Sequence, residues 1–347
     1  GNACCSKDAP EELRHTDQNV ETPSDEDAEI LLAQIDVPAH SAGETLDGVK
    51  SQALLDEARR YLRCCQLLRA DVILQKYEEI ASKLPEDLQR LPAWAKRVRE
   101  VQATIKDKKG ANWKKIELDN NCVLWRCWDA DSGDLQVIFT WEACGSLEQQ
   151  LMAIRDADVL EPFWAGLCWD MKSTHGNSVS LVRWLQKDAV TRQKTEVILE
   201  RVCCVCNGST PYIVMLDRSP DVADIETYSG RYGDFMIDEV PEGYIRPLFT
   251  ASGRVIEPIG KDRCRCTVVL NVQVPSFVRW IMTDSILGLG ANMGAKQTMK
   301  AWNGIIGQWD CSGYVEERRK REAAFYGPTL QPWNSMDSMA ADDRSAE

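Results

Sequence analysis

The sequence has few of the residues that enzymes use to move protons. Its 347 residues include only three histidines: His15 and His40 lie in an acidic N-terminal stretch, and His175 lies in a predicted turn. No serine elbow, phosphate-binding glycine loop or paired-histidine metal motif is present. A single histidine in a loop is more often solvated than catalytic. We therefore expect a protein that is not an enzyme and that carries no cofactor.

Long apolar runs and excess positive charge are also missing. No apolar run approaches the roughly 20 residues that a membrane-spanning helix needs. The 41 Lys and Arg residues are outnumbered by 54 Asp and Glu residues, which gives a formal charge of −13. This balance argues against nucleic acid as a partner, because affinity for the phosphate backbone comes from clustered positive charge. The apolar content of 44% is ordinary and suffices for a sizeable core.

Cysteine, in contrast, is abundant, with fourteen residues. In a chain of this size we expect reduced thiols in the cytosol, and several cysteines lie in strand-like runs where they would pack as small apolar residues. Cys203 and Cys206 have metal-site spacing, but in a strand they would point to opposite faces. A zinc site would require pairing of the strands that carry Cys204, Cys206, Cys264 and Cys266. We predict core packing and no metal.

Residues 1–48 are predicted to form an acylated, acidic and disordered tether. The opening Gly-Asn-Ala-Cys-Cys is close to a myristoylation pattern, in which Gly1 would be myristoylated and Cys4 and Cys5 palmitoylated. Two acyl chains anchor a protein stably, whereas one does so weakly. Residues 7–48 are too acidic and too poor in apolar side chains to fold. The alternative is an unmodified or truncated N-terminus. The tether would place the protein at the cytoplasmic face of a membrane, and otherwise in the cytoplasm.

Residues 49–109 are predicted to be helical, because apolar residues recur at three- and four-residue steps. This segment has fourteen basic and nine acidic residues within an acidic chain. Solvated helix faces of mixed charge explain that balance more simply than contact with lipid headgroups. The segment would also offer a surface to a protein partner.

Strands dominate from Trp113 onward. Turn signals separate a predicted three-strand meander, and Ser146 is the expected cap of a helix that follows it. The meander strands are 113–117, 122–128 and 135–142, the helix is 146–158, and further strands are 178–185, 196–206, 212–218 and 244–250.

The stretch 243–302 ends this succession with a hairpin and a long helix. Between Arg263 and Val274 apolar residues or cysteines alternate with polar ones, which is typical of a strand with one dry face. Residues 253–259 would pair with it across a turn. Pro275 ends the strand, because it has no N–H to donate, and suits the first turn of a helix. Glycines within that helix predict fraying or a kink; they are Gly288, Gly290 and Gly294.

This order of elements resembles the START lipid-transfer family over residues 113–302. Three stretches carry the resemblance: Ala153–Asp158 with Pro162, Phe163 and Trp164; Asp217–Pro220; and Arg254–Pro258 with the following strand and the helix entry Val274–Val278. The resemblance implies an α+β helix-grip fold, in which a curved antiparallel sheet wraps around a long C-terminal helix. A small helical segment would precede it. The START-like domain would span 110–310, and 311–347 would form a mixed-charge helix and a disordered tail.

The resemblance also implies that the domain encloses one lipid or sterol-like ligand between sheet and helix, without chemistry. Burial of hydrocarbon would drive this binding. The candidate lining residues are Phe277, Trp280, Ile281, Ser285 and Leu289 from the helix and, for a headgroup, Arg201, Arg218 and Arg246. The simpler alternatives are a helix packed on the sheet without a cavity and arginines on the sheet's wet face.

We therefore expect a membrane-tethered lipid-binding or lipid-transfer protein. One alternative is a membrane-anchored interaction or adaptor protein whose helix-grip domain is solid. Another, by fold analogy alone, is an enzyme of the cyclase type that this superfamily sometimes hosts.

Overall fold

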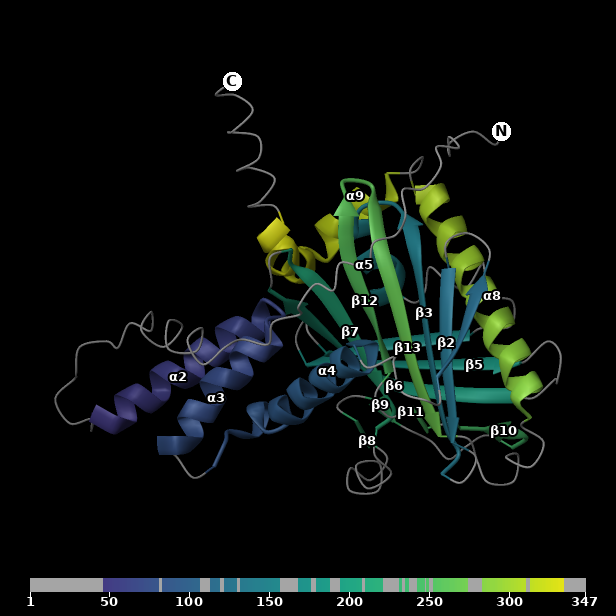
Figure 1. Cartoon of the computed structure of the whole chain (residues 1–347). Coiled ribbons are helices and arrows are strands. Elements are labelled where there is room, and N and C mark those ends of the chain that lie inside the picture. The colour runs from purple at the N-terminus through teal and green to yellow at the C-terminus, as the bar shows by residue number, and fades with distance from the viewer. Residues whose placement is uncertain are drawn as a thin grey trace.

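The computed structural model arranges N-terminal helices, a large sheet and a second set of helices in layers (Figure 1). Structural statements below concern the described residues, which are 46–80, 83–106, 113–118, 122–129, 132–156, 168–175, 179–187, 194–207, 210–220, 231–232, 235–236, 242–246, 248–249, 252–273, 283–309 and 313–333.

The sheet is antiparallel along its main path, with the strand order β1-β2-β3-β13-β12-β7-β6-β5-β4. Two short strands join it at the sides, where β10 pairs with β6 and β11 with β13, and β8 and β9 pair with each other. The strands are β1 (Lys114–Leu118), β2 (Cys122–Asp129), β3 (Asp134–Cys144), β4 (Cys168–His175), β5 (Val179–Lys187), β6 (Lys194–Cys206), β7 (Tyr212–Arg218), β8 (Arg231–Tyr232), β9 (Phe235–Met236), β10 (Tyr244–Ile245), β11 (Leu248–Phe249), β12 (Ser252–Gly260) and β13 (Arg263–Gln273).

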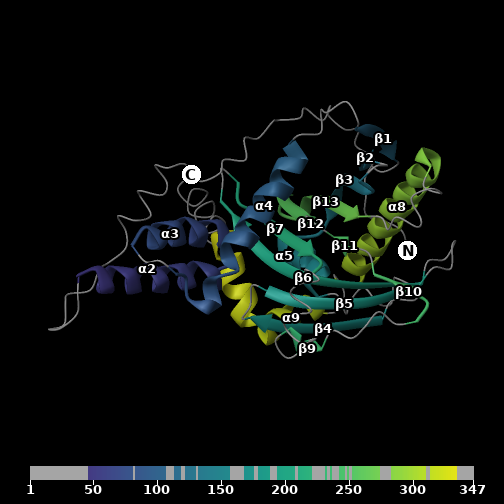
Figure 2. The ribbon, with the colours of Figure 1, turned by 90° about the horizontal axis from the view of Figure 1, so that it is seen from below.

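Helices cover both faces of the sheet, and each face has its own apolar core. The inner face packs on α5 (Leu147–Arg155), α8 (Asp284–Trp309), α9 (Tyr314–Arg321) and the helical residues 323–333. The outer face packs on α2 (Leu46–Arg63), α3 (Leu67–Ile80), the short η1 (Glu86–Leu88) and α4 (Leu91–Lys106). Seen from below, the sheet curves from β1–β3 round to β4–β6, with α8 beside the β1–β3 end (Figure 2). This is the predicted α+β helix-grip fold.

Strand alternation decides which side chains reach which core. In β6 the odd-numbered Cys203 and Val205 lie in the inner core, whereas Cys204 and Cys206 lie in the outer one. Cys264 and Cys266 of β13 belong to the inner core, so the four cysteines considered for zinc are on opposite faces. The described residues contain no group of three or more His, Cys, Asp and Glu that would hold a metal ion. None of the described helices is long and apolar enough to cross a bilayer.

The turn between α2 and α3 reaches the end of the sheet. Cys65 adopts a left-handed conformation there, with φ of 56°. Its carbonyl oxygen accepts a hydrogen bond from the backbone N–H of Val205 at 2.7 Å. Its buried thiol lies 3.3 Å from the hydroxyl of Thr329, in the helical residues 323–333. The N-terminal and C-terminal helices therefore meet at the end of β6.

Most strand predictions are confirmed, and so is one helix cap. The meander forms β1, β2 and β3, and the hairpin forms β12 and β13. Ser146 caps α5: its hydroxyl accepts from the backbone of Gln149 at 3.3 Å, and the Gln149 side chain accepts from the Ser146 N–H at 2.7 Å.

Other predictions are wrong in part. The predicted turn at His175 is the end of β4, and the predicted strand 244–250 is two separate two-residue strands. The final helix is not interrupted, because α8 runs continuously through all three glycines. The predicted disorder after the short mixed-charge helix does not hold for residues 323–333, which are helical and bury Phe325 and Tyr326.

We expect Gly145→Ala to lower the free energy of unfolding by about 2 kcal/mol, as measured by urea denaturation. Gly145 has φ of 102°, and a Cβ there would lie 2.7 Å from Cγ2 of Ile306 in α8. Gly290→Ala is the matched control, because a Cβ at that helical position meets nothing within 4 Å. It should stabilise the protein by roughly 1 kcal/mol. Equal effects of the two substitutions would contradict this account of the β3–α5 corner.

Candidate ligand site between the inner face and α8

Three charged side chains meet on the inner face of the sheet. Arg201 in β6 and Asp217 in β7 are directly opposite each other, and Arg254 lies on the next strand, β12. Nε of Arg201 donates to Oδ1 of Asp217 at 2.7 Å, and Nη2 donates to Oδ2 at 3.2 Å. Nη1 of Arg254 donates to the same Oδ2. We call these three residues the inner charge cluster.

The inner charge cluster carries one more positive than negative charge. The Arg201 and Asp217 side chains are 3% and 4% exposed, and Arg254 keeps 18% of its side-chain surface accessible. Burial alone would raise the pKa of Asp217, but the two guanidinium groups lower it below its usual value. Burial lowers the pKa of Arg254, and the neighbouring Arg201 adds to that effect while Asp217 opposes it. An arginine nevertheless stays protonated in proteins.

Two tryptophans lie beside this cluster. The guanidinium carbon of Arg254 is 5.8 Å from the ring centroid of Trp302 in α8. Trp302 in turn meets Trp141 of β3 edge to face, with ring centroids 5.9 Å apart. Both tryptophans are almost fully buried. The helix, the β3 strand and the inner charge cluster are thus joined through one indole ring.

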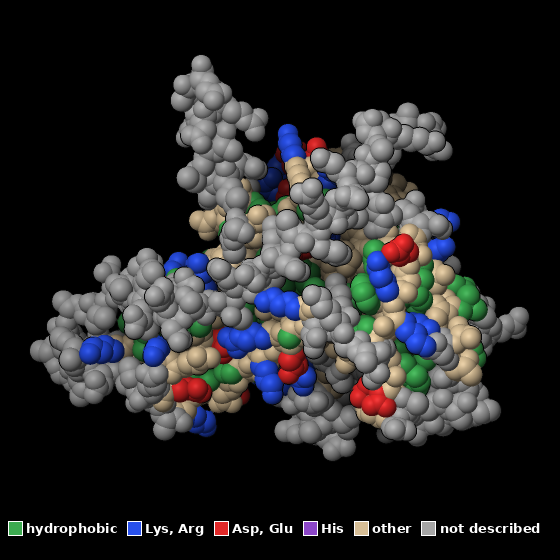
Figure 3. Space-filling model, viewed as in Figure 1, with side chains coloured by type: hydrophobic (Ala, Val, Ile, Leu, Met, Phe, Trp, Pro, Cys, Tyr) green, Lys and Arg blue, Asp and Glu red, His purple; other side chains and the backbone are tan. Residues whose placement is uncertain are grey.

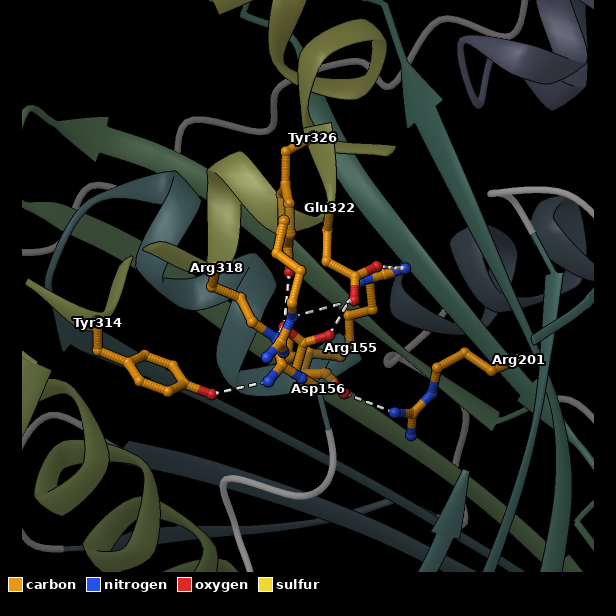
Figure 4. A network of polar contacts seen from close by, with 9 residues as sticks. Arg155, Asp156, Arg201, Tyr314, Arg318, Glu322 and Tyr326 are labelled. Carbon is orange, nitrogen blue, oxygen red and sulfur yellow. Dashed lines mark hydrogen bonds and ion pairs between the residues drawn. The ribbon is translucent and has the colours of Figure 1, made fainter. Parts of the chain in front are cut away.

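A second polar network fastens the C-terminal helices to α5 (Figure 4). Asp156, the buried C-cap of α5, accepts from Nε of Arg318 at 2.7 Å and from the hydroxyl of Tyr326 at 2.9 Å. Arg155 donates to Asp156 and Glu322, at 3.0 Å each. Burial and the Asp156 charge raise the pKa of Tyr326, so its hydroxyl remains a donor.

This Asp156 network adjoins the inner charge cluster. Nη1 of Arg201 donates to the backbone carbonyl of Ile154 at 2.5 Å, two residues before Asp156. Arg155 lies over the ring of Phe325, 4.0 Å from its centroid. The end of α5 is therefore held by the sheet on one side and by residues 314–326 on the other.

The first half of α8 is apolar on two sides. Leu287 is buried, as are Ala295 and Met299 further along. On the other side of the helix Ile286, Leu289 and Met293 are 51%, 62% and 48% exposed. Hydrophobic side chains are visible over α8 at the right of Figure 3. These three residues, the α8 exposed stripe, are the large exposed apolar residues of the described chain.

The structure brings only some of the predicted site residues together. Arg201 faces the inner core, but Ser285 and Leu289 are exposed at the start of α8. Phe277, Trp280 and Ile281 lie outside the described residues, as do Gly1, Cys4 and Cys5.

Arg218 and Arg246 were predicted to contact a ligand headgroup, and this prediction is corrected by the structure. Alternation along the strands places their partners on the outer face. Arg218 donates to Glu200 at 2.8 Å, and Arg90, in the turn just before α4, donates to the other oxygen of that carboxylate at 3.4 Å. Arg246 donates to Glu196, which shares the even-numbered side of β6 with Glu200. Neither arginine is near Arg201's side of the sheet.

Sequence reasoning missed the partners of Arg201. Asp217 and Arg254 were noted only as the first residues of stretches that carry the family resemblance, and Trp141 and Trp302 were not singled out. The available signal was alternation: Asp217 is two residues beyond Met215, and Arg254 two residues before Ile256, so each shares the dry face of its strand.

Asp217→Asn should lower the free energy of unfolding by about 3–5 kcal/mol near neutral pH, because it leaves two buried guanidinium groups without a counter-charge. Since the pKa of Asp217 is lowered in the folded protein, its stabilisation is complete above its unfolded pKa, which is near 3.8, and is lost as pH falls through the folded pKa. The variant should lack this part of the acid sensitivity in urea unfolding between pH 7 and 3. The exposed Glu317→Gln should leave the profile unchanged, and an Asp217→Asn profile parallel to wild type would contradict the assignment.

Tyr326→Phe should destabilise the protein by about 1–2 kcal/mol, because Asp156 loses a buried donor. Tyr314→Phe is the matched control: its hydroxyl accepts from Arg318 at 3.0 Å in a less buried position, and its loss should cost less. Urea denaturation checks the order. A larger loss for Tyr314→Phe would show that the network does not depend on Asp156.

Comparison with solved structures finds similar folds among lipid-transfer proteins. Human STARD10 is 12% identical, covering 72% of this chain and 89% of its own, with a TM-score of 0.47. Human StAR-related lipid transfer protein 5 is 8% identical, covering 64% and 99%, with a TM-score of 0.49. The lipid transfer and protein localization domain of human StarD13 is 12% identical, covering 60% and 95%, with a TM-score of 0.41. The sequence matches no protein-family model and no curated protein. The order of elements and the sheet topology of this chain themselves give it an α+β helix-grip fold.

Proposed function

We propose that this protein binds one lipid-like molecule between the inner face of the sheet and α8, and transfers it to and from a membrane. The α8 exposed stripe is the observation that carries the proposal. A helix with apolar residues on both sides is suited to a buried or lipid-contacting position rather than to a surface position in water. In α8 this holds for residues 286–293, whereas the exposed positions that follow include Lys296, Gln297 and Lys300.

The inner charge cluster supports the same proposal. A lipid site needs an apolar wall for the hydrocarbon and a few polar groups that fix the other end. The inner core supplies apolar side chains from the sheet and from α5 and α8, and Arg201, Asp217 and Arg254 are the charged groups among them. Neither the described geometry nor the sequence provides a nucleophile with an adjacent base, so binding without chemistry is the simpler assignment.

The proposal includes a membrane tether at the N-terminus. Its support is the sequence alone, in which Gly1, Cys4 and Cys5 resemble an acylation site. Gly1→Ala should abolish myristoylation and release most of the protein from the membrane fraction. Cys4→Ser with Cys5→Ser should weaken membrane retention while leaving the myristate mass. Unchanged membrane association of both variants would remove the tether from the proposal.

A membrane-anchored adaptor protein is the second candidate. The observation that favours it is the tight packing around the second half of α8, where Trp302, Ile305 and Ile306 are buried to within 2% exposure. A domain that is solid throughout would bind no lipid and would offer its surface, including α2–α4, to a protein partner. The two candidates differ in whether the purified full-length protein retains a lipid.

Native mass spectrometry of the full chain, purified from a lipid-containing host, should show one lipid of defined mass per protein. A protein that is empty and cannot be loaded from vesicles would overturn the lipid proposal and leave the adaptor.

Leu289→Asp should slow lipid transfer between vesicles about tenfold, because burying a leucine side chain in an apolar medium is worth ~1.5–3 kcal/mol. Gln297→Asp adds the same charge at another exposed position of α8 and should transfer lipid at the wild-type rate. Folding stability of both variants should match wild type, since neither side chain is buried. Equal transfer rates for the two variants would exclude the α8 exposed stripe as the membrane contact.

A further inference from the structure

Hydrogen-bond donors without partners gather beside the inner charge cluster. Three buried nitrogen atoms have no hydrogen-bond acceptor among the described residues: Nε1 of Trp302, Nε1 of Trp141 and Nε of Arg254. Buried polar groups are nearly always hydrogen-bonded, and an unsatisfied one costs about 1–3 kcal/mol. Arg254 of β12 lies beside the Trp302 ring of α8, and Trp302 meets Trp141 of β3, so the three side chains that carry these donors form a chain of contacts that requires an explanation.

All three unpartnered atoms are hydrogen-bond donors, and this restricts the kind of ligand group that could bind them. An indole nitrogen donates and does not accept, and a guanidinium has no acceptor. A group that completes this site must therefore supply acceptor oxygens. A ligand hydroxyl would satisfy part of the site by accepting, but its own proton would find no acceptor on these three side chains.

The charge of the inner charge cluster further restricts the kind of ligand group that could bind there. Arg201 and Arg254 share the single carboxylate of Asp217, so the inner charge cluster has one uncompensated positive charge. Asp217 already accepts from Arg201 with both oxygens and from Arg254 with one. Arg254 is also the member of the cluster with accessible surface, at 18% of its side chain. An anion would balance the charge of the cluster.

We propose that Arg254, Trp302 and Trp141 bind the anionic oxygen group of the ligand, a phosphate or a carboxylate at the polar end of a lipid. This inference rests on the proposed lipid-binding function and names the class of lipid: one with an anionic oxygen group, and not a sterol or other neutral lipid. Trp302 belongs to α8, so a bound anion would connect that helix to β3 and β12. Charge-assisted hydrogen bonds of this kind are stronger than those between neutral groups.

The test compares matched lipids on the full-length protein. Phosphatidic acid and diacylglycerol with the same acyl chains form one pair, and oleic acid and oleyl alcohol form the other. Each is delivered from maltoside micelles and read by native mass spectrometry. The anionic member of at least one pair should be retained at least tenfold more, as expected for charged hydrogen bonds. Equal retention within both pairs would overturn the inference and leave the lipid-binding function standing. No retention of any of the four lipids would count against both.

A second readout locates the anion. The indole N–H resonances of Trp302 and Trp141, assigned with Trp302→Phe and Trp141→Phe, should move downfield with phosphatidic acid and stay in place with diacylglycerol. Inorganic phosphate is titrated in parallel. If it moves both resonances as far while no lipid is retained, the site binds a free anion, and the lipid part of the inference is overturned.

Variants give a third readout with a matched control. Trp302→Phe keeps an aromatic ring for Arg254 but removes the donor, and should reduce retention of the anionic lipid about tenfold. Trp309→Phe is the same change in the same helix, where the ring stacks on Tyr314 instead, and should retain the lipid as wild type does. Circular dichroism checks that both variants fold. Equal retention by the two variants would exclude Trp302 from the site.

Discussion

Both faces of the central sheet are buried, and this constraint governs where its charged residues are and how they are paired. A strand places successive side chains on opposite faces, so neither face of β6, β7 or β12 opens to water as a polar face normally would. Charges on either side must find counter-charges within the sheet or on the covering helices. Arg201, Asp217 and Arg254 do so on the inner face. Glu200 does so on the outer face with Arg218 and Arg90.

The two buried groups have the same composition, one carboxylate with two arginines, but the arginines come from different parts of the fold. On the outer face Glu200 binds two arginines, one from the sheet and one from the turn just before α4, and so joins the outer helical layer to the sheet. On the inner face Asp217 also holds two arginines, but both come from strands. Ion pairs of this kind contribute little net stability when complete, because desolvation offsets their attraction. On the inner face these pairs link the neighbouring strands β6, β7 and β12.

Much of the fold could be predicted from the sequence, because its strands are regular and its turns are marked. The alternation in β13, the turn before it and the capping box of Ser146 are local signals that the tertiary structure does not override. The strand β4 has no such signal in the sequence. His175, its last residue, was therefore predicted to lie in a turn. The glycines of α8 were misleading, because propensity costs about 1 kcal/mol per glycine while packing of the buried side of a 26-residue helix contributes more.

The candidate site was less predictable than the fold, since it depends on pairing between distant strands. Arg201 was recognised as a candidate, but Asp217 is its partner only because β6 and β7 align in one register, and Arg254 joins them from β12. A shift of one residue along a strand moves a side chain from the inner face of the sheet to the outer face. Arg218 at the end of β7 and Arg246 just after β10 show this, because both bind glutamates on the outer face of β6.

The left-handed turn at Cys65 connects the N-terminal helices both to β6 and to the C-terminal helical residues. β6 continues past the point where its pairing with β5 stops, at Val202, and the Cys65 carbonyl occupies the exposed backbone edge beyond it. The same cysteine touches Thr329, near the other end of the described chain. Boundaries drawn from composition at 109 and 310 therefore cut through a closed ring of contacts. Evolutionary exchange of the sheet as an independent unit would have to bring both flanks with it.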